Sequence, residues 1–268
     1  MPLFDICFNL TSSSFRKDES QVVQRALQAG VDHFLVTGSD QQDSEFAAQL
    51  AEQYQNGMYA TAGVHPHLAN RWQQDTRERL RATAESQRVK AIGEAGLDYN
   101  RNYSTREQQV HAFKQQIELA IELQMPLFLH ERDAHDEFYK ILSAYKNDLG
   151  PTVVHCFTGD RTALENYLAM DLYIGITGWI CDERRGTHLQ ELVSSIPRDR
   201  LLIETDAPYL FPRTIQPRPK KMRNEPAYLP HIAEHIARHR GDSIADLSVY
   251  TRENAFKFLG LSTQAKDK

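Results

Sequence analysis

The chain has 268 residues, of which 41% are hydrophobic and 25% charged, so it is long enough to bury its own core as a globular protein. Its net charge of −5 excludes a globally basic nucleic-acid-binding protein, and any site for a polyanion must be local. No apolar run approaches the ~18 residues of a membrane-spanning helix, and the N-terminal stretch does not resemble a signal peptide. Three cysteines without a C-x-x-C pair favour a reducing cytoplasm over a disulfide framework.

Apolar runs alternate with segments of helical spacing along the whole chain. We expect strands at residues 3–10, 31–37, 58–64, 89–92, 126–129, 152–154, 172–176 and 201–204. Apolar residues at helical spacing predict helices at residues 17–29, 44–54, 75–86, 105–123, 133–145, 161–168, 189–196, 229–239 and 243–259. The clearest helix begins at residue 105, where Ser104 or Thr105 would cap it.

The predicted strands are near-continuous apolar runs, which are typical of a parallel sheet covered by helices. About eight strand–helix units with short connections predict an α/β fold, a (β/α)8 TIM barrel, as a single domain over residues 1–268. A doubly wound open sheet is the alternative, but no G-x-G-x-x-G follows the first strand.

The central stretch is V-K-A-I-G-E-A-G-L-D-Y at residues 89–99. It starts as a buried strand, which we interpret as breaking at Gly93, and it then offers the carboxylate of Glu94 between small residues. A carboxylate at the end of an apolar strand is unfavourable unless it is paired or bound to a cation. Taken alone, this stretch slightly favours a Glu94 that caps the next turn over a functional carboxylate.

Other predicted strands end in the same kind of side chain. In a (β/α)8 barrel the carboxyl ends of the strands converge on one mouth, where the chemistry takes place. A single histidine there is more often structural, but imidazoles and carboxylates on several strand ends indicate a site for a divalent metal ion. The side chains that we expect at this mouth are Asn9, His65, His67, Glu94, His130, His155 and Asp206.

Five motifs carry a resemblance to a known family: G-V-H-P-H at 63–67, G-E-A-G-L-D-Y at 93–99, L-H-E-R-D-A at 129–134, H-C-F-T-G at 155–159 and E-T-D-A-P-Y-L at 204–210. In order and spacing they resemble the TatD family of metal-dependent deoxyribonucleases. Three more stretches, N-L-T-S at 9–12, G-W-I-C-D-E-R-R at 178–185 and R-N-E-P at 223–226, resemble a bacterial branch of that family.

The resemblance implies an amidohydrolase-like TIM barrel that hydrolyses phosphodiester bonds. For the bacterial branch it implies a magnesium-dependent 3′–5′ exonuclease acting on single-stranded DNA and RNA, in DNA repair or nucleic-acid turnover. We expect Glu94 and Asp206 to be catalytic, with Asp206 taking a proton from the attacking water. The metal ligands expected from the resemblance are Glu94, His130, His155 and Asp206.

The first strand departs from the family pattern Asp-x-His-x-His. The chain has Asp5-Ile6-Cys7-Phe8-Asn9, so Cys7 and Asn9 stand in place of the two histidines. Because a thiol disfavours hard cations, the first metal position would keep an oxygen-only set of Glu94, Asp206 and Asn9. We therefore predict one tight divalent site and a second magnesium ion that is weak or recruited with the substrate.

Several polar residues are expected to contact the substrate rather than the metal. These are Asn9, His65, His67, Arg132 and Arg223. Arg132 would clamp a phosphate, or equally well form a rim salt bridge with Asp133 or Glu131. The loop at 208–225 is rich in Lys and Arg and would overhang the mouth and attract a polyanion. Three aromatic residues are candidate platforms for stacked bases: Tyr99, Trp179 and Tyr209.

Two other functions remain open at this point. The barrel could hydrolyse a small amide or ester, although we find no lysine at a strand end to bridge metals. It could also be a metal-poor nucleic-acid-binding protein, given the altered first strand. We expect a monomer with single-stranded DNA or RNA as its partner and no association with a membrane.

Overall fold

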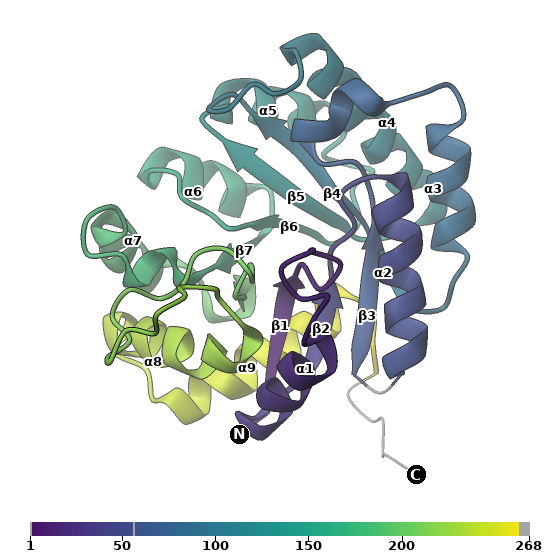
Figure 1. Cartoon of the computed structure of the whole chain (residues 1–268). Helices are drawn as coiled ribbons and strands as arrows, with labels where there is room; N and C mark the ends of the chain where they lie inside the picture. Colours follow the sequence, from purple (N-terminus) through teal and green to yellow (C-terminus); the bar gives the residue numbers. More distant parts are fainter. Residues whose placement is uncertain (1, 56, 263–268) are drawn as a thin grey trace.

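The computed structural model describes residues 2–55 and 57–262, which form a barrel of parallel strands surrounded by helices (Figure 1). Each strand pairs in parallel with the next one along the chain, in the order β1 to β8. The strands are β1 (Leu3–Phe8), β2 (Val31–Val36), β3 (Met58–Ala62), β4 (Val89–Asp98), β5 (Leu127–Arg132), β6 (Thr152–His155), β7 (Tyr173–Ile176) and β8 (Leu201–Ile203). The expected (β/α)8 barrel is thereby confirmed.

Helices follow the strands and cover the outside of the barrel (Figure 1). The α-helices are α1 (Glu19–Gln28), α2 (Gln41–Tyr54), α3 (Thr76–Ala84), α4 (Arg106–Leu123), α5 (His135–Ala144), α6 (Arg161–Ala169), α7 (Thr187–Leu192), α8 (Leu229–Arg240) and α9 (Ile244–Phe258). Short 3-10 helices include η1 (Pro66–Arg71) and η2 (Gly178–Cys181). As expected, Thr105 caps α4: its hydroxyl accepts from the backbone N–H of Gln108 over 3.3 Å.

The barrel closes at its mouth, between β1 and the segment that follows β8. Phe8 forms an isolated parallel bridge with Ala207. The backbone N–H of Asn9 donates to the Ala207 carbonyl over 2.9 Å, and that of Asp206 donates to the Cys7 carbonyl over 3.0 Å. The two ends of the sheet are therefore joined beside the residues that carry the candidate chemistry.

Two groups of apolar side chains form the core. The larger one lies between the strands and the outer helices. The smaller one fills the interior of the barrel with side chains such as Phe4, Phe128 and Leu202, and α9 contributes Phe256 and Phe258 to it. Helix α9 packs against β1 and β8, so it seals one end of the barrel and leaves the other end for the site.

The prediction that the fourth strand breaks at Gly93 is wrong, because β4 continues to Asp98 and contains Glu94. Gly93 and Gly96 have φ angles of +143° and +139°, which favour glycine. A Cβ atom at either position would collide with the backbone of β5. The two glycines therefore allow β5 to approach closely, and they do not end the strand.

The strand expected at 126–129 is also too short, because β5 runs to Arg132 and contains His130. Most other boundaries agree with the expected ones within a few residues. Among the helices of the described residues, none combines the length and apolarity that crossing a bilayer requires. All three cysteines, Cys7, Cys156 and Cys181, are free thiols.

Candidate active site

Four neighbouring elements bring one carboxylate and three imidazoles to a single point. Oε1 of Glu94, in β4, lies 3.2 Å from His65 Nε2, 3.2 Å from His130 Nδ1 and 2.8 Å from His155 Nε2. His65 precedes η1 and accepts the backbone N–H of His67 through its Nδ1, so its Nε2 is turned toward Glu94. We call Glu94, His65, His130 and His155 the Glu94 cluster.

Two further carboxylates hold the outer nitrogens of these rings, and neither was expected as a site residue. Asp98 Oδ2 lies 3.3 Å from His130 Nε2 and 2.7 Å from His67 Nε2. Glu204 Oε2 lies 3.3 Å from His155 Nδ1. A carboxylate behind a metal-ligating histidine fixes the orientation and tautomer of its ring. Both residues stand inside the G-E-A-G-L-D-Y and E-T-D-A-P-Y-L motifs, which is the signal that could have identified them.

The charges of the cluster are mutually stabilised. Burial alone would raise the pKa of the Glu94 carboxyl, but His65 and His155 outweigh it and hold that pKa well below its usual range. Burial would lower the pKa of His130, yet its hydrogen bonds with Asp98 and Glu94 raise that pKa to about 9. Burial prevails at His65 and lowers its pKa. Burial would likewise lower the pKa of His155, yet Glu94 and Glu204 raise that pKa. An ionised carboxylate thus lies beside the positively charged rings of His130 and His155, which supply the charge that a bound cation would otherwise supply.

The donor set fits a divalent metal ion. The ligand atoms of His65, Glu94 and His130 lie within 4.8 Å of one another, and His155 adds a third imidazole nitrogen at the same carboxylate oxygen. Nitrogen and oxygen donors in this ratio suit ions such as Zn²⁺ and Mn²⁺, whereas Mg²⁺ prefers oxygen. Of the expected ligands, Glu94, His130 and His155 are brought together, and His65, which is expected to contact the substrate, lies in the same cluster.

Asp206 follows β8 and lies beside the end of β1. Asn9 Nδ2 donates to Asp206 Oδ1 over 3.0 Å, and Cys7 Sγ lies 3.5 Å from the same oxygen. Burial raises the pKa of Asp206 to about 7 and raises that of the Cys7 thiol well above its usual value. The amide oxygen of Asn9 accepts from Thr37 Oγ1 over 2.9 Å. The oxygen of Asn9 is thus engaged away from Asp206 and Glu94, contrary to the oxygen-only ligand set expected there.

Arg132 lies on the rim, two residues after His130 in β5. Its Nη1 donates to Thr158 Oγ1 over 2.9 Å, and its guanidinium carbon lies 5.0 Å from the ring centre of Trp179. The nearest oxygen of Asp133 is 3.7 Å away, which is long for an ion pair. The guanidinium is therefore held in place without being neutralised, which suits an anionic ligand.

Arg223 is not brought to the Glu94 cluster. Its guanidinium donates to both oxygens of Asp18, over 2.8 and 2.6 Å, and to Glu225 over 2.6 Å. It also lies over the ring of Phe15. These contacts tie the end of the basic loop to α1 and its preceding turn, so the structure gives Arg223 a structural position.

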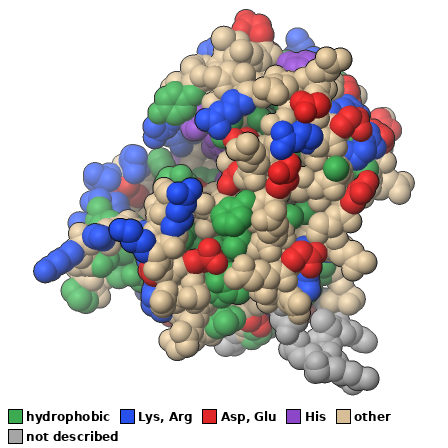
Figure 2. Space-filling view, turned by 45° about the vertical axis from the view of Figure 1, so that its right-hand side comes forward, with side chains coloured by type: hydrophobic (Ala, Val, Ile, Leu, Met, Phe, Trp, Pro, Cys, Tyr) green, Lys and Arg blue, Asp and Glu red, His purple; other side chains and the backbone are tan. Residues whose placement is uncertain are grey.

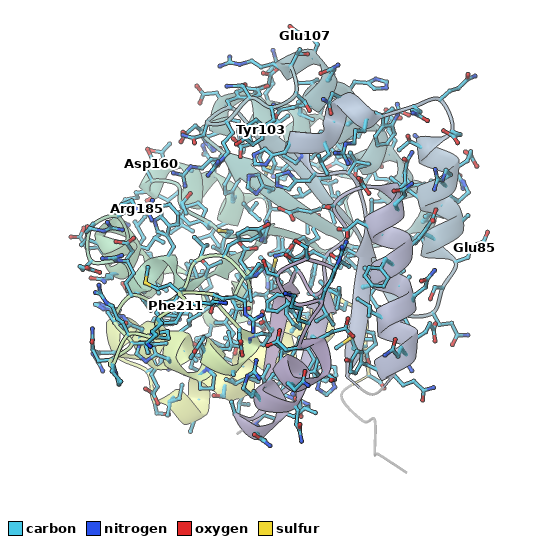
Figure 3. The ribbon with its side chains drawn as sticks, in the orientation of Figure 1. Glu85, Tyr103, Glu107, Asp160, Arg185 and Phe211 are labelled. Atoms are coloured by element: carbon cyan, nitrogen blue, oxygen red, sulfur yellow. The ribbon has the colours of Figure 1, made fainter. Side chains whose placement is uncertain are left out.

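The rest of the basic loop divides into paired and unpaired cations. Arg213 pairs with Glu183 over 3.2 Å, whereas Lys220 and Lys221 form no ion pair with any residue of the described chain. Figure 2 shows Lys and Arg side chains projecting along the left-hand edge of one face, and Figure 3 shows Arg185 on the left side of the molecule. The free charges thus belong to the two lysines.

The three candidate stacking residues differ in how open they are. The Tyr99 ring lies beneath the guanidinium of Arg106, and its hydroxyl donates to Glu137 over 2.5 Å. Trp179 lies against the guanidiniums of Arg132 and Arg185. Tyr209 is 58% exposed, so among the three it offers the most open ring.

The barrel and this mouth define an amidohydrolase-like (β/α)8 metal-dependent hydrolase. A family model described as TatD related DNase matches residues 4–260 of the chain. The chain therefore belongs to the family of TatD-related DNases, and it is a hydrolase of the nuclease class. The expected family is confirmed.

This chain matches similar proteins over their whole length. A protein of Erwinia amylovora named 3′-5′ ssDNA/RNA exonuclease TatD is 53% identical over 259 residues, which are 97% of this chain and 100% of the relative. A protein of Citrobacter rodentium with the same name is 51% identical over 98% of this chain and 100% of its own length.

Solved structures of the family have the same fold. The TatD homologue YJJV of Escherichia coli is 25% identical, with a TM-score of 0.88 over 97% of this chain and 98% of its own. A TatD family hydrolase of Entamoeba histolytica gives the same identity and TM-score over 97% and 99%. An N-acetyl-D-glucosamine-6-phosphate deacetylase of Mycobacterium smegmatis, 13% identical with a TM-score of 0.62 over 97% of this chain and 78% of its own, shares the fold alone.

Proposed function

We propose that the chain is a divalent-metal-dependent 3′–5′ exonuclease that acts on single-stranded DNA and RNA. The observation that carries the proposal is the Glu94 cluster, a carboxylate oxygen with three imidazole nitrogens within 3.2 Å, in a chain that belongs to a nuclease family. The substrate and the direction of digestion follow from the names of relatives that are more than 50% identical over their whole length.

Glu94, His130 and His155 would hold the ion, with His65 as a further donor. When bound, a divalent ion would stabilise the charge that develops on the phosphoryl oxygens and would lower the pKa of a water molecule. Asp98 and Glu204 keep the rings of His130 and His155 in the orientation that the ion requires. We propose magnesium as the ion that supports turnover, because Mg²⁺ typically binds through one or two carboxylates of the protein together with the phosphates of the substrate.

Asp206 is the residue that we expect to receive the proton of the attacking water. Asn9 fixes one of its oxygens by a hydrogen bond, which leaves the other oxygen for that water. Arg132 donates to the uncharged hydroxyl of Thr158, so its positive charge remains available. It would neutralise a phosphate next to the scissile bond. His67, bound to Asp98 and one quarter exposed, would face the substrate strand.

We propose a cytoplasmic setting for the chain. Three free thiols fit a reducing cytoplasm, where a single-domain monomer would serve DNA repair or the turnover of nucleic acids.

The test is a digestion of single-stranded oligonucleotides labelled at the 5′ end. EDTA should abolish the activity, and added Mg²⁺ or Mn²⁺ should restore it. A ladder that shortens from the 3′ end is expected, and a blocked 3′ end should prevent it. Activity that survives EDTA, or products that appear first from the 5′ end, would contradict the proposal.

A further inference from the structure

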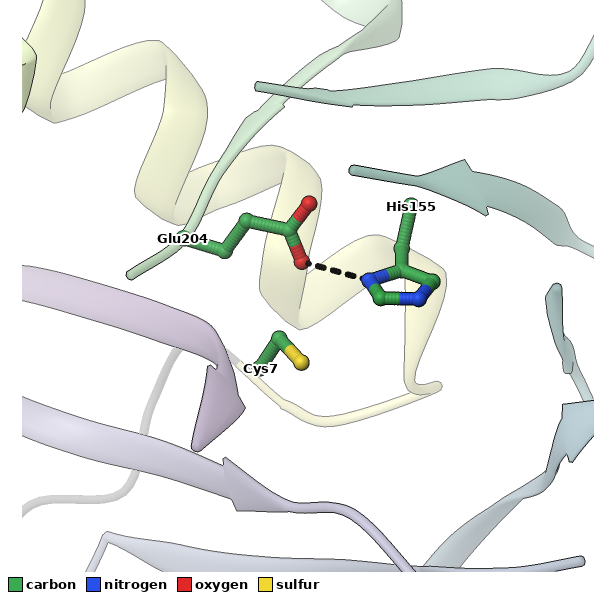
Figure 4. Close-up of side chains that lie close together, drawn as sticks. All are labelled: Cys7, His155 and Glu204. Carbon is green, nitrogen blue, oxygen red and sulfur yellow. Dashed lines mark hydrogen bonds and ion pairs between the residues drawn. The ribbon is translucent and has the colours of Figure 1, made fainter. Parts of the chain in front are cut away.

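His155 presents its two ring nitrogens to two different groups of ligands. Its Nε2 lies 2.8 Å from Glu94, in the cluster already described, and its Nδ1 lies 3.3 Å from Glu204 Oε2. On the Nδ1 side a third ligand atom is present, the sulfur of Cys7 at the end of β1. Figure 4 shows the carboxylate of Glu204, the thiol of Cys7 and the imidazole of His155 facing one another.

The geometry on this side is that of a small metal site. The sulfur of Cys7, one nitrogen of His155 and one oxygen of Glu204 all lie within 4.8 Å of one another. A tetrahedral ion with bonds of about 2.0–2.1 Å to nitrogen and oxygen separates those two ligands by about 3.3 Å, and Nδ1 and Oε2 are 3.3 Å apart. The other Glu204 oxygen accepts the backbone N–H of Cys156 over 2.5 Å, which fixes the carboxylate.

The chemistry of these donors differs from that of the Glu94 cluster. A thiolate, an imidazole and a carboxylate together select a thiophilic ion such as Zn²⁺ or Cd²⁺ and disfavour Mg²⁺. All three residues are almost completely buried, with 0% of Cys7, 2% of His155 and 0% of Glu204 exposed. A divalent ion would balance the thiolate and the carboxylate, which is the condition for burying two anions.

We propose that Cys7, Glu204 and Nδ1 of His155 form an inhibitory site for a thiophilic divalent ion, and that this ion excludes the catalytic one. A neutral imidazole carries one proton on one of its two nitrogens. An ion bound to Nδ1 leaves that proton on Nε2, which then donates to Glu94 and no longer ligates a metal. On binding, the sulfur–hydrogen bond of Cys7 breaks, a sulfur–metal bond forms, and the proton passes to the solvent. The inhibitory effect rests on the proposed function, whereas the binding itself does not.

Binding is tested with Cd²⁺, because a cadmium–thiolate bond has an ultraviolet charge-transfer band. We expect the band of the unaltered protein to saturate at one Cd²⁺ per chain, and we expect Cys7→Ser to lack the band. The double variant Cys156→Ser/Cys181→Ser keeps Cys7 as its only thiol, and it should keep the band with at least half of its intensity. This second variant decides the question even if Cys7→Ser does not fold.

Inhibition is tested by adding Cd²⁺ to the nuclease at a fixed Mg²⁺ concentration. Each variant is compared with its own rate without cadmium. Micromolar Cd²⁺ should lower the rate of the unaltered protein at least tenfold. It should lower the rate of Cys7→Ser by less than about threefold.

A band that persists in Cys7→Ser, or its absence from the double variant, would overturn the site. A band with equal inhibition of both proteins would overturn the exclusion of the catalytic ion. If the band appears as expected while no metal supports any nuclease activity, the proposed function fails and the metal site stands.

Discussion

At the scale of single residues, two imidazole rings of the site each lie between two carboxylates. His130 lies between Glu94 and Asp98, and His155 lies between Glu94 and Glu204. Each imidazole therefore has one nitrogen for an ion and one for a carboxylate that orients it. Because Glu94 Oε1 is the atom shared by all three rings, it is the position at which a change should be most severe.

Replacing Glu94 by Gln should abolish nuclease activity and leave the fold intact. The amide keeps the shape of the side chain but removes the charge that binds the cation, so we expect a loss of at least about 100-fold. The measurement is the initial rate on single-stranded DNA with saturating Mg²⁺, with circular dichroism as a check of folding. Glu107→Gln, an exposed change on α4 at the top of Figure 3, is the matched control. Near-normal turnover by Glu94→Gln would refute the assignment.

Replacing Asp98 by Asn should have a smaller effect of the same kind. The hydrogen bonds that Asp98 accepts from the backbone of Asn100 and Arg101 can be kept by Asn, but the charge behind His130 is lost. We expect metal affinity to fall by about 10–100-fold, as for other residues behind a ligand. Calorimetric titration with Mn²⁺ measures it. Asp133→Asn, at an exposed position nearby, should bind Mn²⁺ normally, and equal affinities of both variants would exclude the orienting role.

Asp98 and Glu204 are site residues that patterns around single residues do not predict. Glu94, His130 and His155 could be identified because each stands next to an apolar run and has a side chain that suits a metal. Asp98 lies beyond Gly93, where the sequence pattern predicts the end of a strand that in fact continues for five more residues. Glu204 and Asp206 follow the same strand, and which of them faces the mouth depends on barrel geometry that no local pattern reveals.

At the scale of elements, the loop between β8 and α8 is the part whose expected role changes most. The sequence predicts that the loop attracts a polyanion and that Arg223 contacts the substrate, yet Arg223 is bound to Asp18 and Glu225. Asp18 lies about 200 positions away in the sequence, so no pattern within the loop could predict this pair. The two exposed lysines of the loop, Lys220 and Lys221, remain available for a polyanion.

Replacing Lys220 and Lys221 together by Ala should weaken the binding of single-stranded DNA and flatten its salt dependence. Each phosphate contact contributes about 0.7 to the slope of log affinity against log salt, so the slope should decrease by about 1.4. Fluorescence anisotropy at several salt concentrations measures it, using the catalytically inactive Glu94→Gln background. Lys114→Ala with Lys140→Ala makes the same charge change on α4 and α5. An unchanged slope for the loop variant would make the loop an ordinary solvated turn.

Helix α8 carries a histidine that should make stability depend on pH. Burial, assisted by His239, His231 and Arg238, lowers the pKa of His235 from 6.5 to about 4, and its Nδ1 is buried with no partner among the described residues. The unfolded chain therefore takes up this proton more readily than the folded one, so the stabilisation is complete above pH 6.5 and decreases as the pH falls toward 4.

We accordingly expect His235→Leu to lose less stability between pH 7 and pH 5 than the unaltered protein, by an amount on the order of 1 kcal/mol. Urea unfolding at the two pH values measures the difference. His111→Leu, at an exposed position on α4, should leave the difference unchanged. Equal pH dependence of His235→Leu and the unaltered protein would show that His235 is solvated.

At the scale of the whole molecule, the barrel could be predicted because its signals are redundant. Eight apolar runs with helical segments between them leave few other arrangements, and errors of a few residues at the ends of elements do not change the topology. The residues that join the first and last strands of the barrel could not be predicted in this way. They include Phe8 and Ala207, which form a bridge although they lie about 200 residues apart in the sequence.

Because the Glu94 cluster joins residues of four elements, metal removal should destabilise the entire barrel. An ion that binds only the folded chain, at 100 times its dissociation constant, contributes about 2.7 kcal/mol. For a protein of this size the melting temperature should fall by on the order of 5–10 °C with EDTA. Differential scanning calorimetry measures the change, and Glu94→Gln should show none. A melting temperature that is insensitive to EDTA in the unaltered protein would contradict a site formed by these elements.

The bridge between Phe8 and Ala207 also means that the barrel can close only after most of the chain has been synthesised. A polypeptide leaves the ribosome with its N-terminus first, and Glu94, His130 and His155 are all translated before Asp206 and its neighbour Ala207. Until residue 207 has been added, β1 lacks the segment that pairs with it after β8, and Asp206, which we propose as the proton acceptor, has only just been added. A chain that ends before this segment would therefore contain the Glu94 cluster but lack both Asp206 and the bridge that joins the first strand to the segment after the last one.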